Sequence, residues 1–394
     1  MPSISCMIMV LRINIDLMKI SLIFLLICLN PMMVQGQIQQ HENYVNSLEW
    51  SPNGEYLLSG STDRTTKIWD NDGKLIDTKF LNGSVLDVKW ISNEKFVTTD
   101  TEQFVLGWEI NNDKPIFKFK RHNGYVKTIG IHLQPNSSDI RIISGGDGSN
   151  VYDYNWDTLD NNLGNNFNIN NVIRDHNQTQ LITTVGISSE GDRYFVGGYD
   201  GYLRIYELNG NNIIDMTSIN LNEKIYSADI SSDGNHIVIS SENSINSYDI
   251  NNFDDVKKIG EISQLKCTEG CLNADIKFNK DNTQIGLAVN KEILVYGWDN
   301  STGFGEEILR LANSDLEYED SMKIYAMDWG LEDQSIVFAI GADIYNYNLE
   351  GVELFSILGV IPEENSLIFY IGISLIFIFI LYYIRKFIRR FVKN

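Results

Sequence analysis

One sequence pattern returns seven times along the 394-residue chain, at intervals of roughly 40 to 50 residues. In each unit a loop residue, acidic in most units, stands six positions before an aromatic residue at a strand end. The loop positions are Asp63, Glu102, Asp147, Asp200, Glu242, Asn290 and Gly341. The aromatic positions are Trp69, Trp108, Tyr206, Tyr248, Tyr296 and Tyr347, with Tyr152 or Tyr154 in the third unit. Such a period indicates that one small structural unit is built repeatedly.

Side chains alternate within each unit in the manner of strands rather than helices. In the first unit the segments 45–50, 55–60 and 67–69 alternate, and the turn residues Ser51-Pro-Asn-Gly54 separate the first two. Glycine-rich turns at 145–148 and 198–201 repeat the second hairpin. Each unit is therefore predicted to be an antiparallel sheet of about four strands. Seven such sheets bury both faces when they pack around a channel, so the predicted fold is all-β, a seven-bladed β-propeller over residues 37–358.

The first unit carries His41, Ser59, Asp63 and Trp69, and at this point the chain resembles the WD-repeat family. The resemblance covers about residues 37–358. It implies that these four residues form a hydrogen-bonded tetrad that ties the inter-blade loop to the sheet. The pairs His122 with Asp147 and His176 with Asp200 repeat part of the set, with Tyr in place of Trp, while the other units lack the His.

We interpret these His and Asp residues as structural, because a catalytic role would require them to converge on one pocket. They are spread around a ring instead, and buried polar networks of this kind stabilise loops. The sequence contains no nucleophile elbow, phosphate-binding glycine loop or paired metal-ligand motif. We therefore expect no enzymatic activity, no cofactor and no metal.

The first 36 residues have the order of a secretory signal peptide: Lys19, then an apolar run from Ile20 to Leu29, then Asn30-Pro31 and the segment Val34-Gln35-Gly36. Met18 is an alternative start of the chain. The apolar run is about half the roughly 20 residues that a membrane-spanning helix needs, so we expect cleavage after Gly36. A retained anchor and a buried strand are the alternatives.

The C-terminal region predicts a membrane anchor. A short stalk at 359–365 precedes a transmembrane helix at 366–384, and residues 367–384 contain no charged side chain. A tail at 385–394 follows, with Arg385, Lys386, Arg389, Arg390 and Lys393. Basic clusters of this kind remain on the cytoplasmic side, which places the propeller on the extracellular or luminal side. The reverse topology, with a cytosolic propeller, is the alternative.

Charge and cysteine content fit that placement. The net charge of the chain is −21, and removal of the leader and the basic tail leaves −27 on the propeller side. Such a surface repels nucleic acid. Cys267 and Cys271 are the only cysteines after the leader, and they predict a disulfide in an oxidising compartment, with free thiols as the alternative. A zinc site is disfavoured because no second cysteine pair or nearby His completes four ligands.

The candidate binding surface follows from the resemblance, since propellers of this family mostly bind partners where the inter-blade loops meet the inner strands. That face is expected to present Tyr44, Tyr125, Tyr226 and Tyr325, and a longer loop adds the acidic residues Asp315, Glu317, Glu319 and Asp320. The alternatives are that the tyrosines pack between blades and that the acidic run is a solvated loop.

Two details of organisation remain open at this stage. The outer strand of the seventh unit comes either from residues 352–357 or from residues 37–40, and the parallel between 350–354 and 72–76 favours the C-terminal segment. Asn-rich insertions at 160–171 and 251–255 are expected to be solvated loops between third and fourth strands.

These observations predict a membrane-anchored propeller that acts as a protein–protein interaction scaffold for a protein or peptide partner on the outer or luminal face. One alternative is a membrane-anchored guanine-nucleotide exchange factor that resembles the propellers of the endoplasmic reticulum, which would require a cytosolic propeller. The other alternative is an envelope enzyme on a propeller scaffold. Fold alone does not separate the three.

Overall fold

The structure is a computed structural model of the 394-residue chain. It describes residues 40–134, 139–148, 150–157, 167–173, 181–263, 275–289, 292–311, 324–330, 333–351 and 353–357. These residues form seven four-stranded antiparallel sheets, and in every sheet the four strands follow one another in the chain. The all-β, seven-bladed prediction is confirmed.

The blades follow the repeat units in order along the chain. The first contains β1 (Val45–Trp50), β2 (Tyr56–Ser61), β3 (Thr65–Asp70) and β4 (Leu75–Phe80). The second contains β5 (Val85–Trp90), β6 (Lys95–Asp100), β7 (Val105–Glu109) and β8 (Phe117–Phe119). The third contains β9 (Val126–Leu133), β10 (Asp139–Gly146), β11 (Val151–Asp157) and β12 (Phe167–Ile173). The fourth contains β13 (Ile182–Ile187), β14 (Arg193–Gly198), β15 (Tyr202–Asn209) and β16 (Asn212–Asn220).

The remaining three blades complete the ring. The fifth contains β17 (Ile225–Ile230), β18 (His236–Ser241), β19 (Ile245–Asp249) and β20 (Lys257–Ile262). The sixth contains β21 (Asp275–Phe278), β22 (Gln284–Val289), β23 (Glu292–Asp299) and β24 (Gly303–Leu311). The seventh contains β25 (Ile324–Trp329), β26 (Ser335–Ile340), β27 (Asp343–Asn348) and β28 (Glu353–Ile357).

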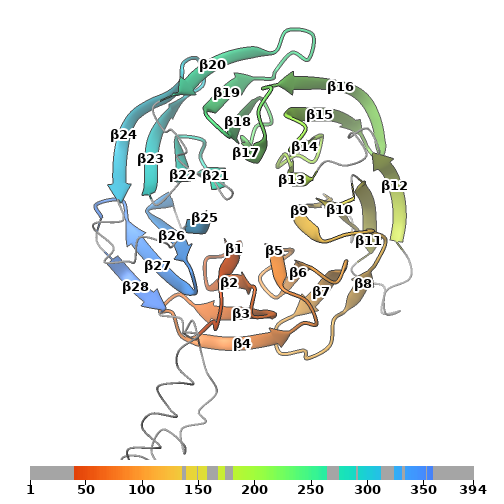
Figure 1. Cartoon of the computed structure of the whole chain (residues 1–394), viewed down its shortest axis with the longest axis vertical. Coiled ribbons are helices and arrows are strands. Elements are labelled where there is room, and N and C mark those ends of the chain that lie inside the picture. The colour runs from red at the N-terminus through yellow and green to blue at the C-terminus, as the bar shows by residue number, and fades with distance from the viewer. Residues whose placement is uncertain are drawn as a thin grey trace, which may run out of the picture. The chain divides into compact units, whose positions relative to one another are not determined.

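The first strand of each blade lines the centre of the ring, and the fourth strand lies at the rim (Figure 1). Inner strands of consecutive blades contact each other, and β1 contacts both β5 and β25, which closes the circle. Both faces of most sheets are therefore covered by neighbouring blades, which explains why the second strands are almost entirely buried. The polar turns lie at the two ends of the ring.

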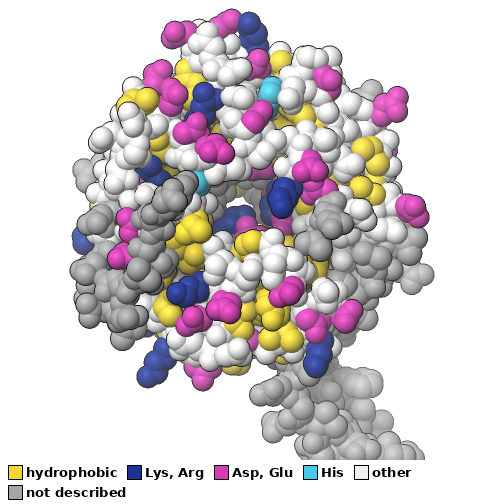
Figure 2. Space-filling model, turned by 180° about the vertical axis from the view of Figure 1, so that it is seen from behind, with side chains coloured by type: hydrophobic (Ala, Val, Ile, Leu, Met, Phe, Trp, Pro, Cys, Tyr) yellow, Lys and Arg dark blue, Asp and Glu magenta, His cyan; other side chains and the backbone are white. Residues whose placement is uncertain are grey.

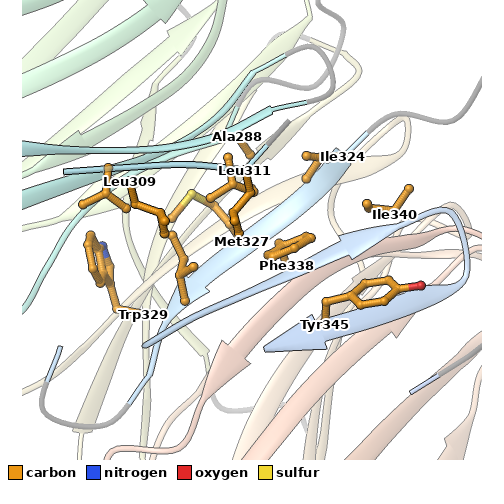
Figure 3. Close-up of a cluster of buried hydrophobic side chains, with 12 residues drawn as sticks. Ala288, Leu309, Leu311, Ile324, Met327, Trp329, Phe338, Ile340 and Tyr345 are labelled. Atoms are coloured by element: carbon orange, nitrogen blue, oxygen red, sulfur yellow. The ribbon is translucent and has the colours of Figure 1, made fainter. Parts of the chain in front are cut away.

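Large apolar side chains fill the spaces between blades. Between the sixth and seventh blades, Met327 lies at the centre of a buried cluster, with Trp329 and Leu309 on one side and Phe338 on the other (Figure 3). Gly286 permits this packing, because a Cβ atom there would lie 2.4 Å from the terminal methyl group of Met327. The blades are thus joined by interlocking cores, and the core extends around the whole ring.

The seventh blade takes its outer strand from the C-terminal side, as the sequence predicts: β28 pairs with β27, with Ile344 opposite Ile357. The insertion at 251–255 lies between β19 and β20, also as expected. The expectation for 160–171 is wrong in part, because residues 167–173 form β12 rather than a loop. Asn170 and Asn171 donate hydrogen bonds to the buried carboxylate of Asp153, so these asparagines serve a polar core rather than solvent.

The predicted leader, stalk, transmembrane helix and basic tail lie entirely outside the described residues. Within the part of the chain that the structure describes, no helix has the length and apolar character needed to cross a bilayer.

Candidate interaction face and central channel

One end of the ring gathers the exposed aromatic side chains. In an antiparallel meander, the starts of the first and third strands and the ends of the second and fourth lie at the same end, here named the loop face. Among the described residues, the exposed aromatic side chains are Tyr44, Phe80, Tyr125 and Tyr202, and all four stand at such positions. Phe80 is 77% exposed. Exposed aromatic rings on a single face are typical of protein-binding surfaces.

The four predicted tyrosines divide into two kinds. Tyr44 and Tyr125 are exposed, as expected of a binding surface. Tyr226 is only 7% exposed and packs edge-on against Tyr199, with a distance of 5.9 Å between ring centroids. Tyr325 is partly buried and lies 5.1 Å from the ring of Tyr44. Burial raises the pKa of both Tyr226 and Tyr325, so these two rings act mainly as packing groups at the channel mouth.

The tetrad residues of the first blade form a continuous network, here named the rivet. Asp63 accepts hydrogen bonds from the His41 Nδ1 and from the backbone N–H of Glu42, both at 2.9 Å. The Oγ of Ser59 lies 2.7 Å from the His41 Nε2 and accepts a bond from the Trp69 Nε1 at 2.8 Å. Because Ser59 lies on β2 and Glu42 precedes β1, the rivet fixes the incoming loop to the sheet.

Electrostatics fit a structural role for the rivet. His41 is fully buried, and burial lowers the pKa of its imidazole, which therefore stays neutral. Burial alone would raise the pKa of the Asp63 carboxyl, but hydrogen bonds from His41 and Thr65 hold it well below its ordinary value. The side-chain polar atoms of all four residues take part in hydrogen bonds, and none of the four lines the central channel, so the network has no free group to offer a substrate.

Other blades keep only parts of the rivet. In the third, the His122 Nε2 lies 2.8 Å from the Ser144 Oγ. Tyr154 holds the aromatic position there, since it lies opposite Ile142 just as Trp69 lies opposite Leu57. In the second, the Trp108 Nε1 donates to the Thr98 Oγ1 at 3.0 Å without any His.

The remaining predicted residues are placed as follows. The backbone N–H of Asp147 donates to the carbonyl of Tyr125 at 2.9 Å. Asp200 forms an ion pair with Arg204 at 2.8 Å. His176, Cys267, Cys271, Asp315, Glu317, Glu319 and Asp320 lie outside the described residues.

A polar channel of about 450 Å³ runs through the centre of the ring. Figure 2 shows the hollow from behind, with basic and acidic side chains beside it. Two lysines in the channel are paired: Lys89 lies 3.1 Å from Glu49, and Lys277 lies 3.0 Å from Asp328. Among the described residues, no group of three or more His, Cys, Asp or Glu is arranged to hold a metal ion.

Inner strands are edge strands, so half of their backbone N–H groups face the channel without a partner strand. Side-chain oxygens of the preceding blade accept at least one of these N–H groups on every inner strand. At a first level the acceptor–donor pairs are Ser47 with Val88, Asp87 with Ile129, Thr128 with Val185, Thr184 with Ala228, and Asp275 with Met327, at 2.9 to 3.2 Å. In every pair the acceptor and the donor occupy the same relative positions on consecutive inner strands.

A second level, two residues further along the inner strands, serves the two junctions that the first level leaves open and adds a second bond between blades one and two. Asp229 accepts from the N–H of Phe278 at 2.8 Å, and Asp328 accepts from Trp50 at 2.8 Å. Glu49 likewise accepts from Trp90. Together the two levels place at least one side-chain-to-backbone bond at each of the seven junctions between blades. We name this set the belt.

The charges of the belt are unequal. The channel is lined by the carboxylates Glu49, Asp87, Asp229 and Asp275 and by the lysines Lys89, Lys127 and Lys277, and Asp328 lies beside Lys277. Burial raises the pKa of Glu49 and Asp87, and it raises that of Asp229 to about 6. Burial alone would lower the pKa of Lys89 and Lys277, but the neighbouring carboxylates raise both, so the lysines stay charged.

Sequence reasoning missed the belt. Its acceptors are ordinary Ser, Thr, Asp and Glu residues on predicted strands, and nothing local separates them from side chains that face solvent. A signal was present, because alignment of the units places an oxygen-bearing side chain at the first belt position in six of seven blades, with Ala326 as the exception.

Comparison with known proteins agrees with this architecture. Residues 33–70 and 168–207 match the family described as WD domain, G-beta repeat. The first of these segments contains the rivet residues of the first blade. The chain thus carries WD40 repeats within a seven-bladed propeller.

Several known proteins share parts of the sequence. The pre-mRNA-splicing factor cwf17 of Schizosaccharomyces pombe is 25% identical over 179 residues, which cover 44% of this chain and 48% of that protein. The human F-box-like/WD repeat-containing protein TBL1X is 32% identical over 92 residues, 23% of this chain and 16% of that protein. Chicken WD repeat-containing protein 1 is 28% identical over 132 residues, 32% and 21% of the two chains. The chain thus spans less than half the length of each of these relatives.

Proposed function

We propose that this protein is a membrane-anchored interaction scaffold whose propeller binds a protein or peptide partner through the loop face, on the extracellular or luminal side of the membrane. The observation that carries the proposal is the confinement of the exposed aromatic residues Tyr44, Phe80, Tyr125 and Tyr202 to that face. Exposed aliphatic side chains such as Ile214 and Met216 lie on the outer strand β16 instead. Similarity to WD-repeat proteins supports a role in protein binding rather than catalysis.

The membrane part of the proposal is supported by sequence alone, through the uncharged segment 367–384 and the five basic residues after it. A disulfide between Cys267 and Cys271 would be consistent with an oxidising luminal environment. Protease treatment of sealed vesicles that contain the full-length protein tests the topology. Protection of the propeller is expected, and digestion from the cytosolic side would contradict it and favour the cytosolic exchange-factor alternative.

The binding surface is tested by affinity capture with the full-length protein. A variant with Tyr44→Ser, Phe80→Ser and Tyr125→Ser should lose the partners that the wild-type protein retains, because its loop face has lost most of its exposed aromatic area. The matched control carries Ile214→Ser and Met216→Ser on β16, removes exposed apolar side chains elsewhere, and should retain those partners. Equal capture by both variants would refute the assignment of the loop face.

A further inference from the structure

The ring has one junction that the chain does not cross. Every blade consists of four consecutive strands, so a loop joins each blade to the next from the first to the seventh. Blades seven and one, in contrast, are joined only by non-covalent contacts between the sheets β25–β28 and β1–β4. We name this junction the seam.

Two hydrogen bonds cross the seam, one in the channel and one on the loop face. The belt reaches it only at the second level, because Ala326 occupies the first belt position and has no oxygen to offer. Asp328 therefore accepts the N–H of Trp50 at 2.8 Å. On the loop face the backbone N–H of Val45 donates to the carbonyl of Gly341 at 2.7 Å. Asp328 is thus the belt residue on which this junction depends.

The apolar contact across the seam involves smaller side chains than that between the sixth and seventh blades. At the seam, blade seven contributes Ala326, Val337, Ala339 and Ile344 to a cluster with Val45, Leu48, Leu57 and Trp69. Its other face contributes Met327, Trp329 and Phe338 to the cluster with blade six. Blade seven therefore contributes no side chain larger than Ile344 to the cluster at the seam, whereas it contributes Met327, Trp329 and Phe338 to the cluster with blade six.

We propose that the propeller opens and closes at the seam, with blade seven parting from blade one while the other six junctions stay intact. In the closed ring Tyr44 of blade one and Tyr325 of blade seven pack together on the loop face at 5.1 Å. Opening separates the two rings and interrupts the loop face at this point. A junction without a covalent link gains chain entropy when it opens, whereas a loop limits that gain at each of the others.

Hydrogen exchange of the full-length protein, followed by mass spectrometry, tests this inference without any partner and so independently of the proposed function. In Asp328→Ala the amides of β1 and β25 should exchange at least tenfold faster than in the wild-type protein, while those of β9 and β13 stay within twofold. Asp328→Asn keeps an acceptor oxygen and should restore most of the protection. The matched control Asp229→Ala removes the belt bond at the junction of blades five and six, which a loop also joins, and should raise exchange there less than threefold.

Equal increases in the Asp328→Ala and Asp229→Ala proteins, or an increase spread evenly over all inner strands, would overturn the proposal. Should Asp328→Ala fail to fold, the wild-type protein provides the same test under increasing urea. The amides of β1 and β25 should then lose protection before those of β9 and β13. Simultaneous loss of protection would show that the ring opens as one unit.

Discussion

Two sets of polar contacts hold this propeller together, and they are distributed differently around the ring. Among the described residues, the rivet on the loop face is complete only in the first blade, where His41, Ser59, Asp63 and Trp69 are connected. The second blade keeps only the bond from Trp108 to Thr98. The belt in the channel, in contrast, has a bond at each of the seven junctions.

This difference in distribution shows that the rivet and the belt have different structural roles. A rivet stabilises one loop on one blade, so a blade that loses it still folds with the same strand register, as the second blade shows. The belt accepts at least one edge N–H of every inner strand and joins each blade to the next, so its omission at any junction would leave a backbone N–H without this acceptor. Most blades can therefore lose rivet residues, because that loss removes contacts within one blade and leaves the belt bonds between blades in place.

The largest effect is expected from removal of the rivet's acceptor. Asp63→Ala should reduce the free energy of unfolding by about 3 kcal/mol, because His41, Thr65 and the N–H of Glu42 lose their bonds to a charged group. The aligned substitution Glu102→Ala in the second blade should change it by less than about 0.5 kcal/mol, since Glu102 is exposed. Chemical denaturation followed by circular dichroism measures both. Similar losses in the two blades would refute the view that rivets act locally.

A rivet histidine should make the protein less stable in acid. Burial lowers the pKa of His122 to about 4, from about 6.5 in the unfolded chain. Its contribution is therefore present above pH 6.5 and is lost as pH falls to 4, with a loss of up to about 3 kcal/mol. The difference in unfolding free energy between the wild-type protein and His122→Gln, measured from pH 7 to 4, should decrease by that amount. A difference independent of pH would contradict a neutral buried His122.

The belt should respond to acid in the opposite direction. Burial raises the pKa of Asp229 to about 6, so the folded protein binds a proton more tightly there than the unfolded chain does. The protonated Asp229 carboxyl therefore stabilises the folded protein below about pH 4, and this stabilisation is lost as pH rises through 6. The expected loss is about 2 kcal/mol after allowance for solvent in the channel. Relative to Asp229→Asn, the wild-type protein should thus gain stability between pH 7 and 4. A loss over that range would mean that Lys277 and Lys89 outweigh the burial of the carboxyl.

The smallest effect concerns a single neutral belt bond. Thr128→Val removes the acceptor of the Val185 N–H and should cost about 1 kcal/mol. Thr66→Val is the matched control, because the buried Thr66 hydroxyl has no hydrogen-bond partner among the described residues. That substitution should be neutral or slightly stabilising. If the two changes had equal effects on denaturation, the bond from Val185 to Thr128 would have no energetic role.

Much of the fold was predictable because its signals are local. Alternating side chains and glycine turns predicted the strands, and the period of the units predicted seven blades. The origin of the last outer strand followed from the likeness of 350–354 to 72–76. The error at 160–171 has a physical reason: an Asn-rich segment is typical of a loop, but Asn170 and Asn171 find a buried carboxylate to bind in Asp153.

The candidate site was predictable only in part. Position in the repeat placed Tyr44 and Tyr125 on the loop face, and both are exposed there. The burial of Tyr226 depends on Tyr199, which reaches it from the neighbouring fourth blade. Phe80 and Tyr202 were missed because no motif marks them. Their exposure depends on how neighbouring blades pack around them, which no local pattern records.

The sequence by itself determined the repeat, the strands, the number of blades and the residues available for the rivet, because each depends on spacing within about 40 residues. Only the tertiary structure decided how the ring closes. The bond from Trp50 to Asp328 joins the first blade to the seventh, and these residues are far apart in the sequence. Asp328 accepts the N–H of Trp50 because two edge strands meet at the seam. The residue types determine which groups can donate or accept hydrogen bonds, but the packing of the folded ring determines which donor meets which acceptor.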